Sequence, residues 1–297
     1  MNDPLNDDRL CLFDGGHLRY PELFKAYKKQ ISMFWTFEEI DLSQDAAHFR
    51  GAPKNIQRLV KHILSFFSIA DAIVMQNISE NFLDVVKAPE AEMFYSAQMF
   101  SESVHAETYN RTILALINDS AEQQQLLQNV PKYKSVQAKK HFADKWMNNN
   151  RPFQEKLVAF AMVEGLLFSA SFTSIYWLKT LNMFPGLVQS NELISRDENL
   201  HCEFAVTLHN LLNNKCSEET IHTIVQDAVN AEKVFVEESI GNNMDGLTVN
   251  DMKDYVEYLA DKLLKQLKVQ PLFNTTFPPN LGFMNLIGVD NKTNFFE

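Results

Sequence analysis

The amino-acid sequence predicts an all-α protein, a helical bundle with further helices packed around it. Hydrophobic residues make up 45% of the 297 residues and include 23 phenylalanines, so a large buried core is expected. Glycine and proline, at 9 and 10 residues, are sparse, whereas β-sheet proteins need frequent turn residues. Because no low-complexity tract or clear linker interrupts the chain, we predict a single domain over residues 1–297.

The first third of the chain predicts an arm followed by two long helices. Residues 1–54 carry scattered glycine, proline and polar residues, as in an irregular arm, and within them residues 21–33 can form a first helix. Residues 55–86 contain no glycine or proline and place apolar side chains on one wide face of a predicted helix. A second long helix is predicted over residues 91–118.

Two more long helices and a surrounding layer are predicted in the rest of the chain. A third helix should start after Pro152, which suits a first helical turn, and run to about residue 183, where Pro185 and Gly186 would end it. The fourth is predicted over residues 190–213. Helices expected to pack around this bundle, and an irregular tail, complete the chain: residues 218–238, 248–268 and 271–297.

Charge and cysteine content exclude several classes of protein. A formal net charge of −11 disfavours nucleic-acid binding, which depends on lysine and arginine. The three cysteines, Cys11, Cys202 and Cys216, have no C-x-x-C spacing, which argues against a disulfide framework and fits the reducing cytoplasm. The acidic N-terminus is unlike a secretory signal, and the longest apolar run, residues 157–172, is short for a membrane span and contains Glu164, so no membrane association is expected.

Two copies of the motif Glu-x-x-His indicate a metal site. Residues three apart share one face of a helix, so each copy, Glu102 with His105 and Glu198 with His201, presents a carboxylate and an imidazole to one point. A single copy is commonly a solvated pair on a helix surface. Two copies, each on a long predicted helix, favour a shared site.

Two further acids, Asp71 and Glu164, complete a two-fold pattern. Each lies in a strongly apolar stretch one helix before a Glu-x-x-His motif, and an unpaired charge there would be costly. The four carboxylates carry a charge of −4, which two divalent cations neutralise and one does not. Carboxylate and imidazole ligands without thiolate favour iron or manganese, and this ligand arrangement is known from ferritin-like di-iron and di-manganese bundles.

Four segments together resemble the small subunit of class I ribonucleotide reductase. They are FWTFEEIDLSQD, FSESVHAETY, LVAFAMVEGLLFSASF and NELISRDENLHCEFA, and the similarity extends from about Tyr20 to the final NKTNFFE. The resemblance implies a di-iron centre, with manganese as an alternative. It divides the ligands into two sets of three, one set for each metal: Asp71, Glu102 and His105 on one, and Glu164, Glu198 and His201 on the other.

The resemblance also implies a radical site at Tyr109, which follows His105 by four positions and so lies one turn further along the same helix face. In the family this tyrosine is oxidised to a stable radical after dioxygen reacts with the reduced metals. Without the metal ligands, a core tyrosine with a hydrogen-bonded hydroxyl would be the simpler reading. Phe168, Phe172 and Ile194 match the apolar pocket that protects the radical, and they would also be ordinary core residues.

A route for the electron and proton to the surface is implied by Trp35 and Asp197. Asp197 precedes Glu198 and could accept a hydrogen bond from the free ring nitrogen of His105, or could instead pair with Arg196. Trp35 matches the family tryptophan that continues this route, although a tryptophan in such a sequence is often simply part of the core.

The function implied is that of a radical-generating subunit that works with a separate large subunit, as a homodimer in the cytoplasm. Family members usually continue beyond NFFE with a tail that docks on the large subunit, whereas this sequence stops at Glu297, so weak binding of the large subunit is expected. A di-iron oxygenase or desaturase on the same bundle is the alternative, and iron storage is a third possibility.

Overall fold

The structure, a computed structural model, describes residues 3–241 and 244–286, and within these ranges it is helical with no strand longer than an isolated bridge. The last part of the expected tail, including NKTNFFE, lies outside the described residues. The α-helices, in chain order, are α1 Pro21–Ser32, α2 Asp45–Gly51, α3 Lys54–Asn77, α4 Pro89–Leu116, α5 Ser120–Asn129, α6 Lys134–Trp146, α7 Phe153–Gly165, α8 Ser169–Thr180, α9 Pro185–Leu211, α10 Glu218–Ile240, α11 Val249–Gln266 and α12 Phe283–Leu286.

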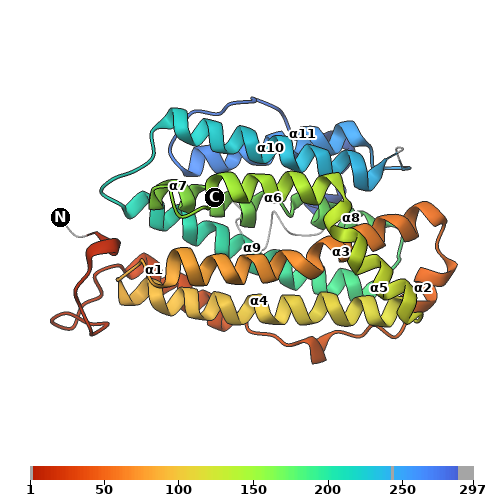
Figure 1. Ribbon diagram of the computed structural model, residues 1–297, viewed down its shortest axis with the longest axis horizontal. Coiled ribbons are helices and arrows are strands. Elements are labelled where there is room, and N and C mark those ends of the chain that lie inside the picture. The colour runs from red at the N-terminus through yellow and green to blue at the C-terminus, as the bar shows by residue number, and fades with distance from the viewer. Residues whose placement is uncertain (1–2, 242–243, 287–297) are drawn as a thin grey trace.

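Four long helices form the centre of the fold. Helices α3 and α4 lie side by side along the long axis, α7 packs on α9, and α10 with α11 forms a layer on the far side of α6 and α7 (Figure 1). The all-α prediction is confirmed. The side chains between these helices make one continuous core that contains most of the phenylalanines.

The third predicted helix is wrong as a single element. It breaks after Gly165, and a separate helix α8 begins at Ser169. Pro185 and Gly186 do not end a helix but begin α9, because proline at the first position of a helix loses no hydrogen bond. The helix predicted over residues 55–86 is α3 followed by a short π-helix, Ile78–Leu83.

The N-terminal arm is less irregular than expected. It contains α1, as predicted, and α2, which was not predicted. Its first residues are tied to the start of α4 by the buried Glu90, whose carboxylate pairs with Arg9 at 2.8 Å and accepts the backbone N–H groups of Arg19 and Tyr20. Short 3-10 helices lie at Pro4–Asn6, Phe37–Glu39, Val130–Lys132 and Pro279–Leu281.

Two stretches are long and apolar enough to cross a membrane by composition alone, Lys54–Leu83 and Phe153–Thr180. Of their most apolar windows, 61% and 94% respectively are buried inside the fold. Such burial is what the core helices of a globular bundle require, so the apolar composition of these stretches is accounted for by packing.

Candidate metal centre

The six predicted ligand residues come from four helices and meet in the centre of the bundle. Asp71 lies on α3, Glu164 on α7, and the two Glu-x-x-His motifs lie on α4 and α9. All six side chains are buried: Asp71, Glu102, His105, Glu164, Glu198 and His201.

The two motifs interlock, because each imidazole faces the glutamate of the other motif. His201 Nδ1 lies 3.0 Å from Glu102 and 3.2 Å from Glu198, and His105 Nδ1 lies 3.0 Å from Glu198 and 3.3 Å from Glu102. Glu164 is 3.9 Å from His201 Nδ1. The ligand atoms of Glu102, Glu164, Glu198 and His201 all lie within 4.8 Å of one another, a spacing that a bound cation can span.

The donor set fits metal ions. Several buried ligand atoms lack a hydrogen-bond partner among the described residues, although an unpaired buried polar atom is costly. They are Asp71 Oδ2, both Glu102 oxygens, Glu164 Oε2 and His105 Nδ1. Asp71 and His105 lie outside the tightest group of four, but His105 contacts Glu102 and Glu198, the glutamates of both motifs.

Burial and mutual repulsion shift the pKa values of several carboxylates at this site. Burial, reinforced by neighbouring carboxylates, raises the pKa of Asp71 and of Glu164 well above the ordinary value. Burial opposes charge on Glu198 too, but its interactions with Glu164, His105 and His201 outweigh this effect and lower the pKa of Glu198. Burial likewise works against a charged His201, yet its bonds to carboxylates raise its pKa to about 9. These acids therefore need protons or metal cations between them.

Two local features bring the helices this close. Gly165 follows Glu164, and a Cβ atom there would lie 2.5 Å from the sulfur of Cys202, which follows His201, so glycine lets α7 approach α9. At the start of α9, the buried carboxylate of Asp45 accepts the N–H groups of Gly186 and Leu187 at 3.0 and 2.8 Å. Negative charge at a helix N-terminus is stabilising, and this contact fixes the helix that carries Glu198 and His201.

Tyr109 lies on α4 one turn beyond His105 and is buried. Its hydroxyl has no hydrogen-bond partner among the described residues, which differs from the satisfied core tyrosine that was the simpler reading. Burial raises the pKa of Tyr109 well above its usual value, and Asp71 is the nearby charge that adds most to this effect. The phenol is therefore held neutral beside the ligands.

An aromatic wall surrounds Tyr109. Phe67 stacks on it with ring centroids 4.2 Å apart, and Phe67 in turn contacts Phe172 at 5.4 Å and Phe168 at 5.8 Å. Ile194 is buried on α9, one turn before Glu198. The sequence reasoning missed Phe67 as a site residue, although its position four residues before Asp71 on a predicted helix mirrors that of Phe168 after Glu164.

A line of hydrogen bonds leads from His105 outward. His105 Nε2 lies 3.2 Å from Asp197 Oδ2, and Trp35 Nε1 donates to the same oxygen at 2.8 Å. Because a carboxylate only accepts, the proton of neutral His105 sits on Nε2, and Nδ1 is left for a metal. Ser101, which the sequence reasoning missed, also contacts His105 and Asp197 at 3.2 and 3.3 Å.

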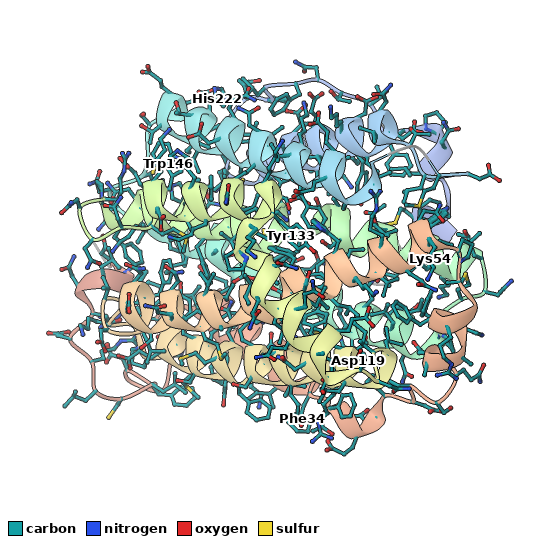
Figure 2. All side chains as sticks on the ribbon, turned by 45° about the vertical axis from the view of Figure 1, so that its right-hand side comes forward. Phe34, Lys54, Asp119, Tyr133, Trp146 and His222 are labelled. Atoms are coloured by element: carbon teal, nitrogen blue, oxygen red, sulfur yellow. The ribbon has the colours of Figure 1, made fainter. Side chains whose placement is uncertain are left out.

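The alternative partner of Asp197 is present as well. Arg196 lies 3.5 Å from Asp197 Oδ1 and donates to the carbonyl of Met33 at 2.7 Å. It therefore braces the segment that carries Trp35 and does not displace His105. Outside Trp35 lies a cavity of about 420 Å³, bordered by Phe34 and Phe100, which are 62% and 51% exposed. Figure 2 shows Phe34 at the edge of the molecule.

The chain is similar to known proteins over nearly its whole length. The family model described as "Ribonucleotide reductase, small chain" matches residues 13–280. A ribonucleoside-diphosphate reductase small chain from Nicotiana tabacum is 41% identical over 290 residues, 98% of this chain and 87% of its own length. The corresponding protein of Spisula solidissima is 42% identical over 296 residues, 99% of this chain and 77% of its own.

Solved structures share the fold. The ribonucleotide reductase Rnr4 homodimer from Saccharomyces cerevisiae superposes with a TM-score of 0.84 at 28% identity, over 92% of this chain and 86% of that one. The R2 subunit from Clostridium botulinum gives 0.85 at 20% identity, over 96% and 93%. An oxygenase or desaturase is not favoured by these matches. By the extent of the family match and the identity to its members, the chain belongs to the small-chain family of ribonucleotide reductase.

Proposed function

We propose that this chain is the radical-generating small subunit of a ribonucleoside-diphosphate reductase, with a two-iron centre and a stable radical on Tyr109. The observation that carries the proposal is a line of hydrogen bonds that leads outward from the centre: His105 and Trp35 both contact one oxygen of Asp197, and Trp35 borders the cavity beside Phe34 and Phe100. A site that only stored iron or oxidised a bound substrate would have no need of such a line. The line gives an electron and a proton a way out toward a partner protein.

Each residue has a defined role in this proposal. Asp71, Glu102 and His105 would hold one metal ion, and Glu164, Glu198 and His201 the other. When bound, the metal pair supplies, together with dioxygen, the one-electron oxidation of a nearby phenol. Carboxylate and imidazole ligands suit iron or manganese, and iron is the metal we propose.

Tyr109 would give up one electron and the proton of its hydroxyl. Among the residues that the structure describes, none bonds to its buried oxygen and could return a proton, which favours a long-lived radical. Phe67, Phe168 and Phe172 exclude water and reductants from the ring. On the outward side, Asp197 Oδ2 accepts hydrogen bonds from both His105 Nε2 and Trp35 Nε1. These bonds hold the two rings in a stacked arrangement with centroids 6.0 Å apart.

The partners follow from the family. We propose a reductase large subunit as the partner that uses the radical, and a homodimer as the state of this chain, which the homodimeric Saccharomyces cerevisiae neighbour supports. Three free cysteines fit a reducing cytoplasm, where we place the protein. The continuous core supports treating residues 1–297 as one domain.

The test is to load metal-free protein with ferrous iron without oxygen, count the bound iron, admit air and record electron paramagnetic resonance spectra. Two irons per chain and a tyrosyl radical are expected, and the radical should be lost in Tyr109→Phe. Tyr176→Phe is the matched control, since Tyr176 is also buried but its hydroxyl is bonded to Ser195 at 2.8 Å. A radical that persists in Tyr109→Phe, or a chain that binds no metal, would contradict the proposal.

The choice of iron has its own test. Manganese with a reduced-flavin oxidant should be offered in parallel, because the ligand types alone do not separate the two metals. A radical that forms only with manganese would leave the proposed ligand residues unchanged but would show that the metal is manganese and not iron.

A further inference from the structure

The break between α7 and α8 leaves backbone groups without helical partners. Helix α7 ends at Gly165 and α8 begins at Ser169, so the last carbonyls of one and the first N–H groups of the other need other partners. Two backbone groups lie at the break: the carbonyl of Leu167, in the turn between the helices, and the N–H of Ala170, in the first turn of α8. Phe168, part of the aromatic wall around Tyr109, lies between them.

A buried ion pair from two other helices satisfies both groups. Lys139 on α6 donates to the carbonyl of Leu167, and Glu232 on α10 accepts the N–H of Ala170 at 2.9 Å. The two side chains pair with each other at 2.8 Å and are only 7% and 0% exposed. The pair therefore clamps the break at two points, within the turn and at the start of α8.

The same lysine supports the aromatic wall. Its ammonium group lies 3.8 Å from the ring centroid of Phe66 and 3.9 Å from that of Phe235, a favourable cation–π arrangement. Phe66 contacts Phe168 at 5.8 Å and Phe67 at 5.6 Å, and Phe67 stacks on Tyr109. Displacement of Lys139 would thus disturb the packing around Tyr109 through the rings of Phe66 and Phe67.

A cavity that solvent can reach lies on the other side of this aromatic wall. The cavity, of about 620 Å³, is bordered by Phe66, Phe168 and Lys139 on its inner side and by Lys140 and Asp144 on its outer side. The side chains of Lys140 and Asp144 are 65% and 62% exposed, so small solutes can approach from solvent. The wall separates this cavity from Tyr109.

We infer that Lys139 and Glu232 are a positioning pair that holds the α7–α8 break closed and so keeps small reductants in the cavity away from Tyr109. A buried ion pair is weak evidence for stability, since apolar residues of similar size often serve as well. The two backbone contacts of Lys139 and Glu232 explain why charged residues, rather than apolar ones, occupy these positions. The inference rests on the proposed function for the radical, but its structural part does not.

The test compares two double variants. Lys139→Met with Glu232→Gln removes the pair while glutamine can still accept the Ala170 N–H. Lys145→Met with Asp227→Asn is the matched control, because Lys145 and Asp227 also join α6 to α10, at 2.6 Å, but near the surface and away from the break. Figure 2 labels Tyr133 and Trp146 near the two ends of α6, with Lys145 next to the second.

The first readout needs no metal. Amide hydrogen exchange over residues 168–172 of the metal-free protein should be about tenfold faster in the Lys139 variant than in the control. If the double variant does not fold, the wild type still tests the clamp. Ala170 should exchange about tenfold or more slowly than Gln154, the second residue of α7, whose first turn has no side-chain cap. Equal exchange in either comparison would overturn the clamp.

The second readout is the lifetime of the radical in ascorbate, which donates an electron and a proton to the phenoxyl oxygen and restores the hydroxyl of Tyr109. Decay should be about tenfold faster in the Lys139 variant at unchanged iron content, and Lys139→Arg, which keeps a charged donor, should restore most of the lifetime. Decay equal to that of the control would overturn the protective role. A wild type without a radical would refute the proposed function, while the exchange result would still stand.

Discussion

Replacing Gly165 with alanine is expected to destabilise the metal-free protein by about 1–2 kcal/mol, because the new methyl group has no room between α7 and α9. Its carbon would lie 2.5 Å from the sulfur of Cys202 and 3.3 Å from Cδ1 of Leu263. Ordinary contacts between such atoms are about 3.5–4.0 Å, so a movement of about 1 Å is required.

The magnitude follows from two opposing terms. Overpacking of a close-packed core costs about 1–3 kcal/mol, and alanine recovers up to about 1 kcal/mol relative to glycine in a helix. Cys202 is buried with its sulfur 3.4 Å from the carbonyl of Ala161, so the strain is expected to move α7 as well as the cysteine. Glu164 and His201 adjoin the two residues in sequence, so iron content should fall as well.

A double-mutant cycle gives the assay. Urea unfolding of the metal-free protein is measured for Gly165→Ala, for Cys202→Ala and for both together. Loss of the sulfur leaves the nearest Cys202 atom, Cβ, at 3.4 Å from the new methyl group, so the two changes should couple favourably by about 1 kcal/mol. Effects that simply add, within about 0.3–0.5 kcal/mol, would refute the steric reasoning.

Three further predictions each concern the substitution of a single residue. Asp45→Ala removes the acceptor at the start of α9 and should lower the free energy of unfolding by about 1–2 kcal/mol in urea titrations, whereas an unchanged value would contradict the capping role. Burial lowers the pKa of His62 to about 4, so the unfolded chain binds a proton that the folded chain does not, and stability falls as the pH drops below about 6.5. Between pH 6 and 5 the wild type should lose about 1 kcal/mol more than His62→Gln, and equal losses would show that His62 does not titrate in this way. Trp35→Phe cannot donate to Asp197, so it should keep its iron and its radical while nucleotide reduction with the large subunit falls roughly a hundredfold, and full turnover would rule out this route.

Sequence patterns alone predict the all-α class and part of the candidate site. The Glu-x-x-His spacing constrains Glu102 with His105 and Glu198 with His201 because helix geometry alone sets their shared face. The structure brings all six proposed ligands together in the centre of the bundle, and their role as ligands stays a prediction. The contacts of Asp197 with both His105 and Trp35 could be expected only from the family resemblance, since they join distant parts of the chain.

What the sequence did not predict depends on long-range contacts. The break after Gly165 lies in an apolar stretch without proline and is stabilised by Lys139 and Glu232, from helices distant in sequence. Helices α5 and α6 were not predicted, because both are short, at 10 and 13 residues, and their sequences are mainly polar. Phe67 was recognised only as a helical core residue, because its contact with Tyr109 depends on how α3 packs against α4.

The most direct test of the central claim is an anomalous-scattering map from crystals of the iron-loaded protein, recorded at the iron absorption edge. We expect two peaks per chain, about 3.5–4 Å apart, one in contact with Nδ1 of His105 and the other with Nδ1 of His201. Glu102 should lie near the first peak and Glu198 near the second, as their present contacts with His105 and His201 within each motif indicate. A single peak, or peaks away from these two imidazoles, would contradict it.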